Sequence, residues 1–196
     1  RDVLRLARLR VAVVFHLASV HLEVHADRAA FEETNVRAVD RLVSDCAEHG
    51  VRRLVHTSSV GIYGHVTHAP AREDSPRAPE TPYEQTKLAG ETAALRRASE
   101  VGLDIVVLRP AWVYGPGCRR TAKLLRAVRK GSFFYVGGGR NLRHPVFIQE
   151  TLEAYVRAAD APGTSSGRAY IIAGPRALTL REMIETCAKA LGVPSP

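Results

Sequence analysis

Short apolar runs alternate along the chain with longer stretches in which apolar residues recur every three or four positions. The short runs are rich in β-branched residues, which predicts buried strands, and the longer stretches have the periodicity of helices. The predicted strands are 11–18, 51–59, 104–108, 133–136 and 169–173, and the predicted helices are 31–49, 83–101, 120–130, 151–161 and 180–191. Strands that alternate with helices indicate βαβ units, so we expect an α/β fold with a parallel sheet covered by helices on both faces.

The residues that follow the predicted strands are the first place to look for a binding site, because a parallel sheet binds ligands at the carboxyl ends of its strands. Hydroxyl side chains stand there in 57–59, and Arg109-Pro110 follows the third strand. Two segments are expected to be irregular: 61–82, a long loop rich in Gly, Pro and His, and the turn-rich stretch 109–117. Long loops in compact domains are often functional.

Composition and charge narrow the class of protein. The 196 residues are 45% apolar and 24% charged, as in a soluble globular protein, and no apolar run is long enough to span a membrane. The net charge is +8, but the basic residues are scattered and not interleaved with aromatic ones, so we expect no nucleic-acid partner. That charge balance equally suits an anionic small ligand. The basic helix 120–130 could meet a substrate diphosphate, although a solvated face is the favoured interpretation.

The cysteines and histidines bear on the compartment and on metal binding. The cysteines are odd in number and form no CxxC pair, which predicts a reduced, cytoplasmic location. His65, His68 and His144 do not have the spacing of zinc ligands, so we expect no metal. The three cysteines are Cys46, Cys118 and Cys187.

Candidate chemistry begins with Tyr83 and Lys87 at the start of a predicted helix. Residues four positions apart lie on one helix face. A lysine ammonium beside a phenol lowers the pKa of the phenol, which makes it a usable general acid or base near neutral pH. An ordinary exposed Tyr/Lys pair would explain the same spacing. Ser59 supports the chemical interpretation, because it ends the preceding strand, where a hydroxyl can hold a substrate oxygen near the phenol.

Together with these residues, a series of ordered motifs resembles one known family. The chain is similar to the extended short-chain dehydrogenase/reductases, of the NAD-dependent epimerase/dehydratase type. The resemblance covers nearly the whole chain. The matching segments are His16-Leu17-Ala18, Asn35, TSSVGIYG at 57–64, EDSP at 73–76, YEQTK at 83–87, RP at 109–110, VYGPG at 113–117 and the region 145–155.

The resemblance implies a role for each matching residue. Tyr83 would be the catalytic acid/base, Lys87 would lower its pKa and hold the nicotinamide ribose hydroxyls, and Ser59 would bond the reacting oxygen. Asn35 would support this network. The backbone of Leu17 and Ala18 would line the cofactor, and Pro110 to Val113 would flank the nicotinamide amide. The implied cofactor-binding residues are therefore Leu17, Ala18, Asn35, Tyr83, Lys87, Pro110 and Val113, with NAD or NADP as the cofactor.

The resemblance also implies an organisation. We expect a doubly wound Rossmann-type sheet without its first strands, with a partial dinucleotide-binding domain at 1–116 and a partial substrate-binding lobe at 117–196. In the family a glycine-rich GxxGxxG turn precedes the region where this chain begins, and the substrate lobe usually continues past the point where it stops. Both ends are therefore expected to be incomplete. The partner would be a small-molecule substrate, and a homodimer is also considered.

Departures from the family pattern leave the activity open between two classes. One is an NAD(P)-dependent oxidoreductase or epimerase, which moves a hydride between nicotinamide and a substrate carbon. The other is a degenerate, non-catalytic relative that acts as a binding module. After Arg109 the sequence reads Pro-Ala-Trp where sugar epimerases often have an asparagine, which leans toward reductases of more apolar, sterol-like substrates. Trp112 would line such a pocket or pack in the core. Glu150 stands where the family has an aspartate.

Overall fold

The computed structural model describes residues 11–21 and 27–196. It divides into two compact units, each built from two stretches of the chain. The first unit comprises Arg1–Pro110 and Glu153–Ile172, and the second comprises Ala111–Leu152 and Ala173–Pro196. The sequence predicts one boundary, between 116 and 117, whereas here the chain leaves the first unit after Pro110, re-enters it at Glu153 and leaves again after Ile172. That the second unit binds substrate stays a prediction.

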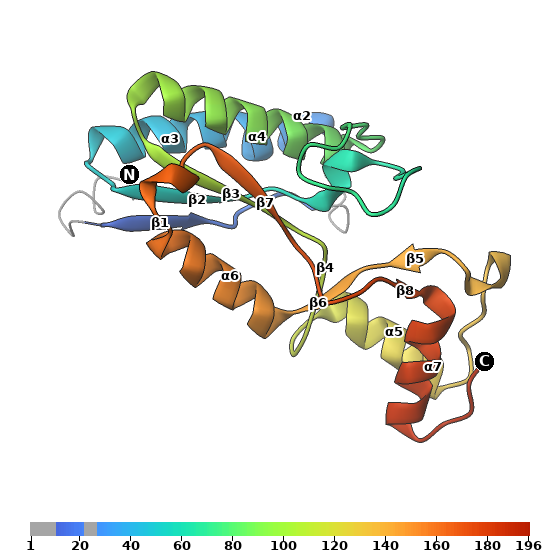
Figure 1. Cartoon of the computed structure of the whole chain (residues 1–196). Helices are drawn as coiled ribbons and strands as arrows, with labels where there is room; N and C mark the ends of the chain where they lie inside the picture. Colours follow the sequence, from blue (N-terminus) through green and yellow to red (C-terminus); the bar gives the residue numbers. More distant parts are fainter. Residues whose placement is uncertain (1–10, 22–26) are drawn as a thin grey trace. The chain divides into compact units, whose positions relative to one another are not determined.

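A four-stranded parallel sheet forms the centre of the first unit, in the order β1-β2-β3-β7 (Figure 1). The apolar residues are consecutive within the strands, most clearly in β3, where residues 105–108 are Ile, Val, Val and Leu and all are buried, as expected for a strand covered on both faces. The sheet confirms the predicted α/β class. Its strands are β1 (Val13–His16), β2 (Arg53–Thr57), β3 (Asp104–Pro110) and β7 (Arg168–Ile172).

Helices cover the two faces of this sheet (Figure 1). On one face, α3 and α4 pack through Val43, Ala94 and Ala98 against Leu54 and Ile105 of the strands. On the other face, Tyr155 and Ala158 of α6 pack against β2 and β3. The helices of the unit are α2 (Arg28–Glu32), the π-helical η1 (Glu33–Arg37), α3 (Ala38–Glu48), the 3-10 turns η2 (Val60–Tyr63) and η4 (Gly163–Ser165), α4 (Pro82–Val101) and α6 (Ile148–Asp160).

Strong local signals set both ends of α4. Thr81 and Glu84 form a capping box, in which each side chain bonds the other residue's backbone N–H, and Pro82 follows Thr81 at the first helical position. Gly102 ends the helix with φ of 69°, a left-handed conformation that suits glycine. The caps place Tyr83 in the first turn, where the helix begins beside the sheet.

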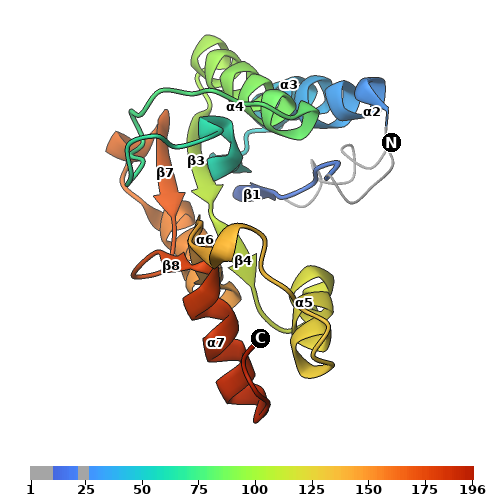
Figure 2. The same ribbon diagram turned by 90° about the vertical axis from the view of Figure 1, so that its right-hand side faces the viewer.

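The second unit contains two small sheets and two helices (Figure 2). Strand β4 (Trp112–Tyr114) pairs in parallel with β6 (Pro145–Phe147), and β5 (Leu142–Arg143) pairs antiparallel with β8 (Leu178–Thr179). Helix α5 (Arg119–Arg129) packs with α7 (Leu180–Leu191) around Val128, Met183 and Ile184. Short 3-10 turns include η3 (Gly137–Gly139).

Two predictions for this region are wrong. No strand forms at 133–136, where Phe133 and Tyr135 instead pack as side chains in the α5–α7 core. The stretch 109–117 is not only turns, because its first residues extend β3 and its centre is β4. In both places tertiary packing outweighs local propensity.

Among residues 11–21 and 27–196, no helix combines the length and apolar character needed to cross a bilayer. The same residues contain no group of three or more His, Cys, Asp or Glu side chains arranged to hold a metal ion.

Candidate active site

Helix α4 carries Tyr83 and Lys87 on the side that faces the sheet. Lys87 is only 4% exposed and Tyr83 is half-buried. The Lys87 Nζ donates a hydrogen bond of 2.5 Å to the backbone oxygen of Thr57, at the carboxyl end of β2. Thr57 in turn shares a 2.6 Å hydrogen bond between its hydroxyl and that of Tyr155 on α6. The lysine thus ties the helix to the edge of the sheet where ligands of this class of fold bind.

Burial sets the ionisation of Lys87. It lowers the pKa of the ammonium to about 8, while the carboxylate of Glu91 acts in the opposite direction. Lys87 is therefore charged at neutral pH but titrates at a much lower pH than an exposed lysine.

Ser59 follows the carboxyl end of β2, at the start of the short helix η2. Its Oγ accepts the backbone N–H of Gly61 at 3.0 Å and so begins the short helix η2. The serine hydroxyl also acts on the pKa of Tyr83, in the direction that favours the phenolate. The neighbouring Ser58 hydroxyl is buried without a hydrogen-bond partner among the described residues.

The pKa of Tyr83 is raised, contrary to the expectation that Lys87 lowers it. Burial is the main cause, the Ser59 hydrogen bond opposes it, and the charge of Glu84 adds to it. The ring packs edge-on against His21, with centroids 4.8 Å apart. The Lys87 ammonium is directed to the Thr57 carbonyl instead, which is the physical reason for the difference.

Two imidazoles, from His16 on β1 and His56 on β2, lie in register next to each other. Their Nδ1 atoms are 3.0 Å apart and their rings stack. Burial and the charge of Lys87 lower the pKa of His16 to about 4 and that of His56 well below its usual value. Both rings are therefore neutral at pH 7.

Asn35 lies in the π-helical segment η1 and is 3% exposed. Its Oδ1 accepts from Ser19 and from the Val20 backbone, at 3.0 and 2.9 Å, and its Nδ2 donates to Val20 and to Thr86, at 3.2 and 3.1 Å. The amide joins the segment after β1 to α4. A Cβ on Gly90 of α4 would lie 2.0 Å from the Asn35 carbonyl, so glycine is required for this close approach.

The other predicted cofactor residues lie in different parts of the fold. Leu17 follows β1 at the carboxyl edge of the sheet with 58% exposure, and Ala18 beside it is also exposed. Pro110 is buried at the end of β3. Val113 belongs to the second unit, where it pairs with Val146. Its place beside a cofactor stays a prediction.

Sequence reasoning missed a buried ion pair next to this site. Glu91, one turn after Lys87, binds Arg109 of β3, and both side chains are 1% exposed. Glu91 repeats the four-residue spacing of Tyr83 and Lys87, and this spacing is the signal that would have revealed it. The partner on β3 is visible only in the structure.

The chain is similar to characterised enzymes along almost all of its length. The NAD dependent epimerase/dehydratase family matches residues 2–173. A 2-alkyl-3-oxoalkanoate reductase of Stenotrophomonas maltophilia is 30% identical over 84% of the chain and 52% of its own length. A UDP-glucose 4-epimerase of Mycolicibacterium smegmatis is 32% identical over 96% of the chain and 63% of its own length. The chain thus spans little more than half the length of such relatives.

Solved structures agree with this result. MoeE5 in complex with UDP-glucuronic acid and NAD matches with a TM-score of 0.83 at 29% identity, over 97% of this chain and 66% of that one. RMD from Pseudomonas aeruginosa, complexed with NADPH, matches with a TM-score of 0.81 at 26% identity, over 94% and 67%. Both of these structures hold a nicotinamide dinucleotide, and their similarity to this chain confirms the predicted Rossmann-type fold. The chain belongs to the NAD-dependent epimerase/dehydratase family, the extended short-chain dehydrogenase/reductases.

Proposed function

We propose that the protein is an NAD(P)-dependent oxidoreductase or epimerase in which Tyr83 exchanges a proton with a substrate oxygen. One observation carries this proposal: Tyr83 lies one helical turn from Lys87, whose buried ammonium α4 holds at the carboxyl end of β2. A general acid, a polarising hydroxyl and a fixed cation at the carboxyl edge of a parallel sheet suit carbonyl and alcohol chemistry.

The residues of this edge fit a nicotinamide cofactor. Among the described residues, Lys87 donates to Thr57 alone, so two of its three N–H groups can donate to ribose hydroxyls. The exposed segment at Leu17 and Ala18 would supply backbone contacts, and Pro110 would flank the ring. When bound, NAD or NADP would supply the hydride acceptor or donor.

The ionisation of Tyr83 determines its part in each direction of the reaction. Because the pKa of its phenol is raised, the hydroxyl is protonated at neutral pH and can donate a proton to a carbonyl oxygen that is being reduced. In the oxidation direction it must accept a proton, and the Ser59 hydroxyl would stabilise the phenolate. Ser59 Oγ accepts from Gly61, which leaves its own hydrogen free to donate.

The substrate class that we propose is a nucleotide sugar or a sterol-like or other small carbonyl compound. Relatives at about 30% identity act on both kinds: the UDP-glucose 4-epimerase on one side, and the 2-alkyl-3-oxoalkanoate reductase on the other. Ala111 and Trp112, which replace the polar side chain common in sugar epimerases, favour the apolar class.

Replacing Tyr83 with Phe tests the proposal. It removes one hydroxyl, and general acid–base groups contribute ~10²–10⁴-fold to rate. We expect a loss of that size in turnover, measured by consumption of NADH or NADPH with a 3-oxoalkanoate and by chromatographic detection of the epimer with UDP-glucose, because epimerisation leaves no net change in the cofactor. Tyr170→Phe is the matched control, because no hydrogen bond joins the hydroxyl of this β7 residue to residues 11–21 or 27–196. A Tyr83→Phe enzyme as fast as the control would overturn the assignment of Tyr83.

A further inference from the structure

Three polar residues follow one another at four-residue intervals on the sheet-facing side of α4: Tyr83, Lys87 and Glu91. The proposed function gives a role to Tyr83 and to Lys87, but none to Glu91. Its side chain is 1% exposed, and a carboxylate is very costly to bury without a partner. Its position next to the site therefore calls for an explanation.

Arg109 on β3 provides the partner. Its Nε donates to Glu91 Oε2 at 3.0 Å, and its Nη2 donates to Glu91 Oε1 at 2.6 Å. This bidentate pair fixes the position and orientation of the carboxylate and neutralises its charge. Arg77 lies at the limit of ion-pair distance, 4.0 Å from the same carboxylate oxygen.

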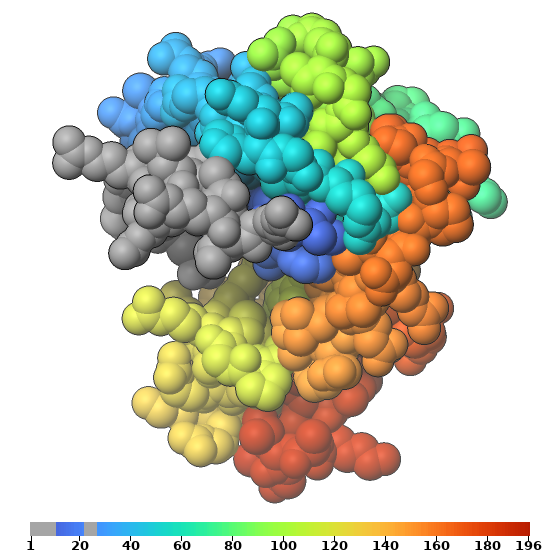
Figure 3. All heavy atoms as spheres, turned by 90° about the vertical axis from the view of Figure 1, so that its left-hand side faces the viewer, coloured from blue at the N-terminus to red at the C-terminus, as the bar shows by residue number. Residues whose placement is uncertain are grey.

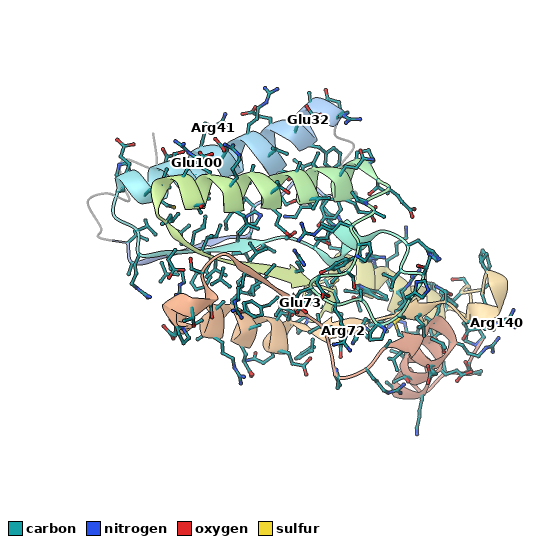
Figure 4. The ribbon with its side chains drawn as sticks, turned by 45° about the horizontal axis from the view of Figure 1, so that its top comes forward. Glu32, Arg41, Arg72, Glu73, Glu100 and Arg140 are labelled. Atoms are coloured by element: carbon teal, nitrogen blue, oxygen red, sulfur yellow. The ribbon has the colours of Figure 1, made fainter. Side chains whose placement is uncertain are left out.

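The third nitrogen of Arg109 connects this pair to the long loop. Its Nη1 donates to the Tyr63 hydroxyl at 2.5 Å and to the backbone oxygen of Glu73 at 2.8 Å. The Glu73 side chain accepts the backbone N–H of Ile171 on β7 at 2.9 Å, and Figure 4 shows Glu73 beside that strand. One arginine thus connects the loop 64–81, the sheet and α4.

Glu91 is also the negative charge that acts on Lys87. The titratable groups that face Lys87 from neighbouring elements are His16 on β1 and His56 on β2, with Glu91 on its own helix. Both imidazoles are neutral at pH 7, so they do not stabilise the ammonium. Burial disfavours the ammonium and only the Glu91 carboxylate opposes burial.

We propose that Glu91 is a positioning residue for the Tyr83–Lys87 pair. Arg109 holds the Glu91 carboxylate where it keeps Lys87 in its ammonium form, and the same arginine fixes the loop 64–81 to the helix that carries the pair. The consequence for catalysis rests on the proposed function. The effect on the charge of Lys87 does not, and it can be measured without cofactor or substrate.

The chain has only four lysines, Lys87, Lys123, Lys130 and Lys189, which makes this measurement direct. Protein labelled with ¹³C at the lysine Cε is titrated by NMR, and the Lys87 signal is identified by its loss in Lys87→Met. In Glu91→Gln we expect the Lys87 midpoint to fall from about 8 by about one pH unit, because a nearby opposite charge is lost and Arg109 is left unneutralised.

Glu100→Gln is the matched control, because Glu100 lies on the same helix but its ion pairs with Arg96 and Arg97 are exposed. Its Lys87 midpoint should equal that of the parent. An unchanged midpoint in Glu91→Gln would overturn the proposal.

A second variant covers the case in which Glu91→Gln does not fold. Glu91→Gln combined with Arg109→Met removes both charges of the ion pair, so neither partner is left without the other, an exchange that proteins often tolerate. The Lys87 midpoint should fall here too, by less than in the single variant, and a midpoint equal to the parent's would overturn the proposal. If the midpoint falls but Tyr83→Phe keeps full activity, the proposed function fails while the role of Glu91 in the charge of Lys87 stands.

Discussion

Two buried arginines lie at opposite ends of the central sheet, and they have different partners. Arg53 begins β2 and Arg109 stands near the end of β3, and each is 1% exposed. Arg53 donates to Asp104, at 2.9 and 2.5 Å, and to the backbone oxygens that end α6, among them those of Ala158 and Ala159 at 3.0 and 3.2 Å. It caps a helix, and none of its partners is a candidate site residue.

Arg109 makes the same kinds of bond at the carboxyl end of the sheet, but its partners lie on α4, the helix that carries Tyr83, and in the loop 64–81. Figure 3 shows one face of the first unit, on which the dark blue atoms of β1 lie between cyan atoms that follow α3 and the orange atoms of α6. The comparison teaches that burial of a charge does not by itself mark a functional residue. The position of the charge in the sheet is the better guide to function, since parallel sheets bind ligands at the carboxyl ends of their strands. We therefore assign stability to Arg53, and both stability and site geometry to Arg109.

Replacing Arg109 should have the largest effect, on both stability and kinetics. Arg109→Met leaves the Glu91 carboxylate buried without its main partner, and breaking a buried pair in this way costs about 3–5 kcal/mol. We expect that loss in urea unfolding and, in the molecules that remain folded, a fall in kcat together with a shift of the pH profile. Normal kinetics per folded molecule would show that Arg109 serves stability alone.

Arg53→Met should affect only stability. The variant loses charged hydrogen bonds, worth about 1.5–3 kcal/mol, but leaves Asp104 25% exposed, so that water can solvate the freed carboxylate. Urea unfolding should show this smaller loss, with kcat and KM per folded molecule unchanged. A changed pH profile here would erase the distinction between the two ends.

The sequence predicts the features that depend on neighbouring residues better than those that depend on residues far apart in the chain. Thr81, Pro82 and Gly102 define α4 locally, so the helix and the place of Tyr83 could be predicted. The pairing of β4 with β6 joins residues far apart in the chain, and no local pattern records it. The Glu91–Arg109 bond likewise depends on how α4 lies against β3. The raised pKa of Tyr83 follows from burial, which residue spacing does not contain.

A smaller effect is expected on the stability of the fold in acid, through the imidazoles of His16 and His56. The pKa of His16 falls from 6.5 to about 4 on folding, and that of His56 also falls, so the unfolded chain binds more protons in this window. Stability should therefore be complete above pH 6.5 and decrease as the pH falls toward 4. His16→Asn should flatten that decrease in urea unfolding measured against pH. An equally steep decrease in the variant would contradict the assignment.

The smallest effect is expected on the outer face of α3 and α4, where Figure 4 places Arg41 and Glu100. Glu100 is exposed, and water already screens its pairs with Arg96 and Arg97. Glu100→Gln should leave both the unfolding midpoint and the kinetics within error of the parent. A loss comparable with that of Arg53→Met would mean that exposure is a poor guide to the role of charges in this protein.

The most direct test of the central claim, that the Tyr83–Lys87 edge holds a nicotinamide cofactor, is an NMR titration of the ¹³C-lysine-labelled chain with NAD and NADP. We predict that the Lys87 signal moves most, since its free N–H groups would bond the ribose, and that the exposed Lys189 signal stays in place. A Lys87 signal that does not move at millimolar concentrations of either dinucleotide would contradict the account.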